Sequence, residues 1–425
     1  MTRTDFYGWK ILAALWIIVF INLAFPIYGS SVINAAMMED LNLDRQTLGL
    51  LFSLFTILSG LPGPLVALCV GRYGVRLTLT AGSVLVVLGA VLMATVVKSG
   101  LLAAFAFGII VGSGVAAGGM IAAQAGLANW FVRRRALALS VISTATGVGG
   151  FVASPLLNRI IEAAGGNWRM GWWVIALLAC CAAAVALMFI RNRPADLGQV
   201  PDGEAASEKP DAAENIRKRR AAVHITAREW SSREALSGLS YWVMMFCHLS
   251  LSCGYTVFLA HGVVHLQDLG HSRDMAAWAP SFMAFAGLFA KIIVGIFGDR
   301  IEPRYLWAVF IASLGVGTWF MVSADTTATL LAAAGLVGIG FGGGVVCLAA
   351  VISNYYGIKP FAVLIGISVA VNTTIGAIAP AVAGRLYDAG YGYTAVFHTI
   401  MVWCLLGAVL LFFLKPPFMN TKEKP

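Results

Sequence analysis

The chain has 425 residues, of which 59% are hydrophobic and 12% are charged, with a formal net charge of +9. A soluble domain carries about 25% charged residues, so this chain has too few to cover a water-facing surface of its size. A single soluble core stops growing near ~250–300 residues. The composition therefore excludes a large soluble domain. The basic residues sit in short loops, which argues against a nucleic-acid partner.

Apolar segments follow one another along most of the chain, and a membrane-spanning helix needs ~20 apolar residues. The first segment is too long for the apolar region of a signal peptide and lacks a convincing cleavage site, so we expect it to be a membrane span. Twelve spans are predicted, at about 9–32, 47–70, 77–97, 101–128, 137–162, 168–190, 240–266, 275–297, 305–323, 328–353, 361–386 and 392–414.

One long polar stretch, 191–239, separates the sixth span from the seventh, and it has too few apolar residues to form a core. We expect a bundle over 1–190, a linker over 191–239, and a second bundle with a short tail over 240–425. The seven cysteines all lie in apolar runs without metal-ligand or redox spacing. They are interpreted as small buried hydrophobic residues, and no metal or cofactor is expected.

Lysine and arginine set the orientation of a membrane protein, because cytoplasmic loops carry an excess of them. Placing the N-terminus in the cytoplasm puts most of the 29 basic residues on that side, including the run Arg133 to Arg135. The sequence thus predicts a multi-pass protein of the cell (inner or plasma) membrane with both termini and the linker in the cytoplasm.

The two halves of the sequence repeat each other at one offset. Gly112 recurs 226 positions later as Gly338, and Asn129, followed by two aromatic residues, recurs 225 positions later as Asn354. A six-plus-six repeat with a long linker resembles the major facilitator carriers. The resemblance implies an all-α membrane protein with twelve transmembrane helices in two six-helix, pseudo-symmetric bundles.

The loop that contains Asp299, Arg300 and Arg304 resembles the facilitator signature between the second and third helices of each half. Arg72 and Arg76 lie in the corresponding loop of the first half, where Gly71 stands at the position of Asp299. A carboxylate there favours a helix N-terminus and arginines favour C-terminal carbonyls, so this set is predicted to form a cytoplasmic gate. The alternative is ordinary positive-inside loop chemistry.

The segment from Trp130 to Arg135 (WFVRRR), which leads into a helix of small residues, resembles the fifth-helix signature of the monocarboxylate transporter family. The segment from Asp5 to Trp9 (DFYGW) and the later Pro26 resemble that family's first helix, in bacterial members in particular. Oxalate/formate antiporters share several of these motifs. The resemblance covers essentially the whole chain and implies transport of a small organic anion.

Lys291 lies inside the eighth predicted span, six residues from its end, whereas every other lysine or arginine within the predicted bounds lies within three residues of a span end. Carboxylate carriers place an arginine at this position. A charge in hydrocarbon costs ~2.5–3.5 kcal/mol on insertion scales and is usually functional, so we expect Lys291 to bind the substrate carboxylate. The alternative is that its side chain reaches the nearby interface.

His261, His265 and Asp268 lie at spacings of four and three, which places them on one face of the seventh helix. Histidine titrates near neutral pH. The family resemblance implies that His261 contacts substrate and that His261 or Asp268 carries a proton. The alternative is that Asp268 and His271 cap the outer end of the helix. No further ligands accompany the histidines, so a metal is not expected.

Other polar residues within spans tend to face the bundle interior. The set proposed to contact substrate with Lys291 and His261 is Tyr28, Gln124, Tyr255 and Asn372. Asn22 and Asn129 are polar positions of the same kind, and each of these residues is equally suited to bridging helices. Two positions depart from the animal monocarboxylate carriers, which have a lysine where Ile27 stands and an aspartate where Gly287 stands.

The sequence therefore predicts a secondary active transporter of a small monocarboxylate, of the lactate or pyruvate kind, that works by proton symport and alternating access. The runner-up is an organic-anion exchanger of the oxalate/formate type. A dianion favours a second cation in the eleventh helix, and none lies between Ile365 and Gly376. Neither an enzyme nor a sensor is expected. The expected partners are the substrate anion, a proton and the lipid bilayer, with no obligate protein partner.

Overall fold

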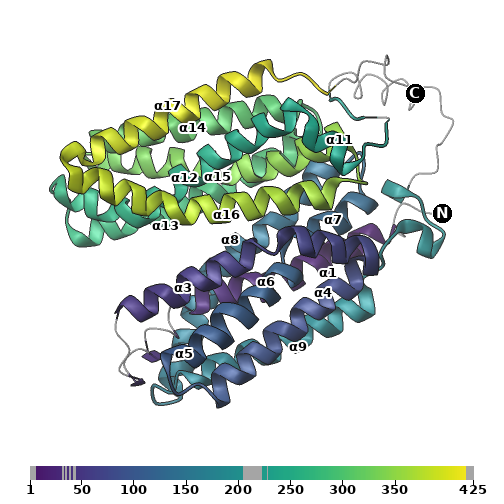
Figure 1. The fold of residues 1–425 in the computed structure, drawn as a ribbon, viewed down its shortest axis with the longest axis horizontal. Helices are drawn as coiled ribbons and strands as arrows, with labels where there is room; N and C mark the ends of the chain where they lie inside the picture. The colour runs from purple at the N-terminus through teal and green to yellow at the C-terminus, as the bar shows by residue number, and fades with distance from the viewer. Residues whose placement is uncertain are drawn as a thin grey trace. The chain divides into compact units, whose positions relative to one another are not determined.

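The computed structural model describes residues 6–30, 33, 36, 37, 40, 41, 45–203, 223–226 and 228–417. This part of the chain is helical and contains no β-strand (Figure 1). It forms two compact units. The first comprises Met1–Ala206 with Ile365–Ala377, and the second comprises Ser207–Leu364 with Ile378–Pro425.

The helices of the first unit come in chain order from the N-terminal part of the sequence. They are α1 (Gly8–Val19), η1 (Phe20–Gly29), α3 (Arg45–Gly60), α4 (Gly63–Thr95), α5 (Gly100–Ala103), η2 (Ala104–Val111), α6 (Gly112–Gly118), α7 (Met120–Trp130), α8 (Arg135–Ala163) and α9 (Arg169–Phe189), followed by the short 3-10 helices η3 (Pro194–Leu197) and η4 (Pro201–Gly203). The segments η1 and η2 are π-helical. Short π-helical stretches inside α-helices often mark functional positions.

The second unit begins with the short helix α11 (Ser232–Ser237). Its long helices are α12 (Leu239–Asp268), α13 (Arg273–Phe297), α14 (Pro303–Val322), α15 (Thr327–Tyr356), α16 (Phe361–Leu386) and α17 (Gly392–Phe413), with η5 (Tyr387–Tyr391) between the last two. Helix α15 packs against both α13 and α14, and α14 packs against α17. Residues 365–377 of α16 belong to the first unit.

Eleven helices in the described part of the chain are long and apolar enough to cross a membrane, and the shorter apolar helix Leu51–Gly60 adds to them. The predicted all-helical membrane fold is confirmed. The longest of these helices, α4, has 33 residues. At 1.5 Å per residue it measures ~50 Å, which exceeds the ~30 Å hydrocarbon layer.

Gly74 explains the excess length, because its φ of 83° and ψ of 169° interrupt α4. A positive φ is accessible to glycine at no steric cost. The chain therefore turns at Gly74, where the sequence predicts a loop between the second and third spans. The second span itself, predicted as continuous over 47–70, is interrupted at Leu61 and Pro62, between α3 and α4.

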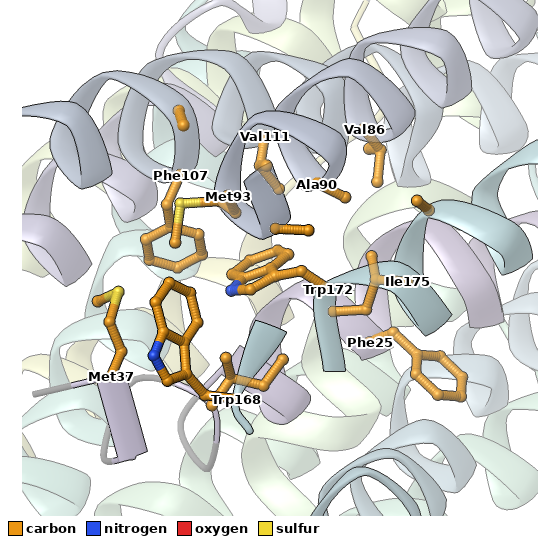
Figure 2. Packing of buried hydrophobic residues seen from close by; sticks show 14 of the residues in the cluster. Phe25, Met37, Val86, Ala90, Met93, Phe107, Val111, Trp168, Trp172 and Ile175 are labelled. Carbon is orange, nitrogen blue, oxygen red and sulfur yellow. The ribbon is translucent and has the colours of Figure 1, made fainter. Parts of the chain in front are cut away.

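Aromatic side chains fill the core of the first unit (Figure 2). Phe107 stacks on Phe55 with ring centroids 4.5 Å apart and meets the edge of Trp172 at 5.6 Å. Trp168 and Trp172, at the start of α9, are both buried. Helices in lipid gain little from hydrophobic burial, so close van der Waals packing of this kind holds them together.

Four of the cysteines, Cys247, Cys253, Cys347 and Cys404, are buried as expected. The expectation is wrong for Cys180 and Cys181, which are exposed on α9. Both lie in an apolar membrane-spanning helix, where an exposed side chain meets lipid rather than water. The apolar run alone does not distinguish a buried position from a lipid-facing one.

The beginning of the predicted linker packs on the first unit. The Nδ2 of Asn129 donates to the carbonyl of Asn192 (3.2 Å), and the backbone N–H of Arg76 donates to the side-chain oxygen of Asn192 (3.0 Å). The carboxylate of Asp202 accepts the backbone N–H groups of Val132 and Arg133, at 3.2 and 2.8 Å. These contacts satisfy polar backbone groups before α8.

The end of the linker packs on the second unit as a strap, which we define as residues 223–226 and 228–230. The backbone N–H of Thr226 donates to the carbonyl of Asn354 (2.8 Å), and that of His224 donates to the Glu302 carboxylate (2.7 Å). The Trp230 ring lies edge-on to Tyr356, with centroids 5.5 Å apart. We call the end of each unit that the linker contacts its linker end.

His224 is the titratable group of the strap. Burial lowers its pKa, and the positive charge of Arg304 acts in the same direction, while Glu302 opposes both. Its ring also lies edge-on to Tyr355. Because the docked strap favours neutral His224, docking is complete above the ordinary histidine pKa of 6.5 and weakens as the pH falls below it.

We therefore expect the amide protons of His224 and Thr226 to lose protection against hydrogen exchange between about pH 7 and about pH 5. Protection factors, corrected for the intrinsic pH dependence of exchange, measure this directly. His224→Phe keeps the ring contact with Tyr355 and removes the titration, so it serves as the control and gives a flat profile. A flat profile in the unmodified chain contradicts the assignment.

Candidate functional site

Lys291 lies on α13, six residues before the end of the helix at Phe297. Its side chain is half-buried, and the helix around it belongs to a candidate membrane span, Trp278–Phe297. The backbone of Lys291 therefore lies about 9 Å along the axis from the linker end of a membrane helix. This position allows a role in substrate binding and also allows the side chain to reach the interface.

Gly287 lies one turn before Lys291, against the backbone of α15. A Cβ atom at Gly287 would lie 3.0 Å from the carbonyl oxygen of Gly338 and 3.7 Å from Gly342. Glycines of this kind let two membrane helices approach closely. The aspartate of the animal carriers has no space here unless α13 and α15 move apart, which explains this departure from the family pattern.

His261, on α12, makes two polar contacts within the second unit. Its Nε2 lies 2.8 Å from the carbonyl oxygen of Pro380, and its Nδ1 lies 3.1 Å from the hydroxyl of Tyr393. A carbonyl only accepts, so Nε2 carries the proton. Neutral His261 then accepts from Tyr393, and protonated His261 donates to the same oxygen. Gaining a proton reverses one hydrogen bond and breaks neither.

His265 joins the same cluster through Tyr393. Its ring centroid lies 5.3 Å from that of Tyr393, and its Nε2 donates to the carbonyl of Met321 (2.8 Å). Asp268, the last residue of α12, is exposed. His271 follows it and contacts the carbonyl of Ala324. The structure thus gathers the two histidines around one tyrosine and leaves the carboxylate at the surface.

The remaining predicted substrate contacts are spread over several helices. In the second unit, Tyr255 of α12 stacks on Phe341 with centroids 3.8 Å apart. In the first unit, Tyr28 is an exposed residue of η1, and Gln124 of α7 is buried. Asn372 of α16 is also buried. Each lies on a membrane-spanning helix, as the sequence predicts.

Asn22 has a structural role that the geometry makes explicit. Helix α6 ends at Gly118, and α7 begins after Gly119, so the continuous fourth span of the prediction contains a break. The Nδ2 of Asn22 donates to the Gly118 carbonyl (3.2 Å) and to the Ser83 hydroxyl (2.7 Å). Asn22 therefore satisfies a carbonyl at the break and joins three helices of the first unit.

The predicted gate residues lie at the linker ends. Arg304 places its guanidinium over the ring of Tyr305, 4.6 Å from the centroid, and Arg72 lies over Tyr73 at 5.6 Å. Arg76 makes the contact with Asn192 given above. Asp299 is half-buried and Arg300 is exposed. The structure places the two arginine groups in different units and shows stacking on tyrosine for one member of each.

The basic run Arg133 to Arg135 has a structural role that could not be inferred from the sequence. Arg135 is buried, and its Nε donates to the carbonyl of Phe131 (3.0 Å), just after the end of α7. A cation at a helix C-terminus donates hydrogen bonds to the free carbonyls and interacts favourably with the negative end of the helix dipole. Arg134 lies over the ring of Trp9, at 5.7 Å. One arginine of the run thus caps a helix and another stacks on the N-terminal motif.

A second missed cluster lies at the opposite end of the first unit. The Nε1 of Trp168 and the guanidinium of Arg169 both donate to Asp40, at 2.8 and 3.2 Å. Arg169 also donates to the carbonyl of Val97 (3.1 Å). These hydrogen bonds hold the pKa of Asp40 below its ordinary value. Asp40 and Val97 are far in the chain from the adjacent pair Trp168 and Arg169, and no local spacing signals their contact.

These features define a membrane carrier, with helices that span the bilayer, polar side chains within them and a cation on α13. A family model described as Major Facilitator Superfamily matches residues 15–272 and 244–425. The chain belongs to the Major Facilitator Superfamily, and it is a transporter rather than an enzyme.

Several curated proteins are similar to the chain over most of its length. The uncharacterized MFS-type transporter YcxA of Bacillus subtilis (strain 168) is 22% identical over 421 residues, which covers 93% of this chain and 94% of that protein. Monocarboxylate transporter 2 of Homo sapiens is 24% identical, and the match covers 94% of this chain and 85% of that protein. Monocarboxylate transporter 12 of Rattus norvegicus is 24% identical, covering 68% of this chain and 61% of that protein.

Solved structures show the same fold at low identity. The proton:xylose symporter XylE, bound to 6-bromo-6-deoxy-D-glucose, superposes with a TM-score of 0.73 at 15% identity, covering 96% of each chain. The human organic anion transporter MFSD10 superposes with a TM-score of 0.67 at 18% identity, covering 95% of this chain and 99% of that one. The resemblance to the monocarboxylate transporter family seen in the sequence is confirmed by the curated relatives.

The Gly287 contact predicts a stability effect. Gly287→Ala forces a methyl group against the Gly338 carbonyl, and overpacking of this kind costs about 1–3 kcal/mol. We expect a lower thermal unfolding midpoint in detergent, measured by tryptophan fluorescence.

Gly71→Ala is the matched control, because a Cβ at Gly71 meets no atom within 4 Å. The close contact between α13 and α15 is refuted if both variants unfold at the temperature of the unmodified chain.

Proposed function

We propose that this transporter moves a small monocarboxylate, of the lactate or pyruvate kind, together with a proton. The observation that carries the proposal is the cation of Lys291 on a membrane-spanning helix. A charge at such depth is costly, and functional use is the usual reason for its retention. The printed names of several relatives, monocarboxylate transporters, support an anionic cargo.

A lysine binds a carboxylate as a compact point charge with three donors, whereas the arginine of related carriers offers a planar fork. The substrate geometry is therefore less constrained at Lys291 than at an arginine. Tyr28, Gln124, Tyr255 and Asn372 are the proposed polar contacts that orient the rest of the molecule. Lys291 is the only lysine or arginine more than three residues from an end of the predicted spans, and one cation at that depth suits a monoanion.

Proton coupling is assigned to His261 or Asp268. His261 suits the role because it can gain a proton without losing either of its hydrogen bonds. Both of its ring nitrogens are engaged, which favours the proton role over direct contact with substrate. The exposed carboxylate of Asp268 suits proton uptake from water. One proton and one monoanion together carry no net charge.

We further propose that the protein lies in the cell (inner or plasma) membrane, with both termini and the 191–239 linker in the cytoplasm. The excess of lysine and arginine at the linker ends supports this orientation. The bundles 1–190 and 240–425 exchange inward-open and outward-open states by alternating access. Asp299, Arg300, Arg304, Arg72 and Arg76 form the proposed cytoplasmic gate.

The second candidate function is exchange of organic anions. Motifs shared with the oxalate/formate group favour it, but Ile365 to Gly376 of α16 carry no second cation for a dianion. Uptake into proteoliposomes driven by a pH gradient, without counter-substrate inside, separates the two mechanisms. Symport proceeds under these conditions and obligatory exchange does not.

The test of the anion site is uptake of a panel of labelled short-chain acids by reconstituted protein. Lys291→Ala removes the cation, and we expect a loss of at least about tenfold in uptake, equivalent to ~1.4 kcal/mol. Lys291→Arg keeps the charge and retains part of the activity.

Lys98→Ala serves as the matched control, since Lys98 is exposed in a loop of the first unit. The proposal fails if Lys291→Ala transports every acid of the panel at the rate of the unmodified chain.

A further inference from the structure

Helices α14 and α17 of the second unit lie side by side (Figure 1). A groove runs between them on the surface of this unit. Its volume is about 380 Å³. On α14 it is lined by residues at helical spacing, including Ala308, Val309 and Ala312, and on α17 by Ala408 and Phe412. The alanines form the hollow, because their side chains end at Cβ while the larger neighbours extend outward.

The groove is apolar and open to the outside. Val309 is 66% exposed, Phe412 is 58% exposed and Phe413 is 73% exposed. Both helices belong to candidate membrane spans, so these side chains meet lipid chains rather than water. A hollow of this shape fits a flexible hydrocarbon chain.

Cationic and hydroxyl groups lie at one end of the groove. The ring of Tyr305 lines it and packs against Phe412, with centroids 5.4 Å apart. The guanidinium of Arg304 lies on that ring and donates one N–H to the Tyr305 hydroxyl (2.8 Å). Arginine has five such donors, so others remain for an anion. Lys415, two residues beyond the end of α17, is exposed.

Glu302 is the carboxylate nearest to this end in the sequence. It is buried, and one of its oxygens accepts the backbone N–H of His224 in the strap. One oxygen of Glu302 therefore faces the strap, where the charge of Arg304 also acts on His224. Among the described residues beside the Tyr305 end of the groove, Arg304 is half-buried and Lys415 is exposed, and both are positive.

We propose that this groove binds an anionic phospholipid, with an acyl chain between α14 and α17 and the phosphate at Arg304, Tyr305 and Lys415. Arginine pairs well with phosphate oxygens, and basic pockets between membrane helices on the cytoplasmic side suit acidic headgroups. A second copy of the chain fits less well. A two-fold contact through this face places Arg304 and Lys415 of both copies in one interface, where their like charges repel.

Native mass spectrometry of the full chain in detergent tests the proposal, with phosphatidylglycerol and phosphatidylcholine of identical acyl chains as the probes. We expect a bound phosphatidylglycerol that phosphatidylcholine does not replace at equal concentration. Removing both cations with Arg304→Gln and Lys415→Gln weakens this preference by roughly fivefold for each charge. Arg300→Gln is the control for charge, since Arg300 is exposed at the same linker end.

Substitutions that fill the groove test whether an acyl chain lies between α14 and α17. Ala312→Phe with Ala408→Phe removes the bound lipid, whereas Ala395→Phe, elsewhere on α17, keeps it. If the double variant does not fold, Val309→Trp with Val409→Trp blocks the groove from two exposed positions. Equal binding of the two lipids, an unchanged preference in the filled variants, or a dimer that the filling dissociates would each overturn the proposal.

Discussion

The hydrocarbon interior of a bilayer offers no hydrogen-bond partner to a backbone amide or carbonyl, and each unsatisfied group there costs several kcal/mol. Long apolar segments in this chain therefore form helices, and a break in a helix needs a substitute partner. The break between α6 and α7 shows this directly. The Gly118 carbonyl accepts a hydrogen bond from the Asn22 amide, which Ser83 also holds in place. One buried asparagine permits an irregular backbone within a membrane helix.

The hydrocarbon interior of the bilayer also explains why the helices pack closely. Because lipid chains are as apolar as leucine, helices are held by contact rather than by escape from water. Gly287, Gly338 and Gly342 bring the backbones of α13 and α15 together, directly beside the turn that carries Lys291. The space that would hold the acid of related carriers is used for packing. The proton site that we propose at His261 lies elsewhere in the same unit, where the ring contacts the hydroxyl of Tyr393.

Much of the fold could be predicted from the sequence, because membrane spans produce long hydropathy signals. Two breaks could not, since the interruption at Pro62 and the split at Gly119 depend on single residues within apolar runs. The polar residues of the spans could be named, but not their partners. Asn22 bridges helices, and His261 contacts Pro380 and Tyr393, which lie more than a hundred positions away. Such contacts arise from helix packing, and the spacing of residues in one segment does not encode them.

The central claim is that the cation at position 291 binds the carboxylate of the substrate. Lys291→Cys, in a chain whose seven native cysteines are replaced, allows the charge at this position to be restored chemically. After reconstitution, uptake of a labelled monocarboxylate is measured before and after modification with a cationic, a neutral or an anionic thiosulfonate reagent. The account predicts that Lys291→Cys is inactive and that the cationic reagent alone restores uptake. Full uptake by unmodified Lys291→Cys, or equal recovery with all three reagents, would contradict it.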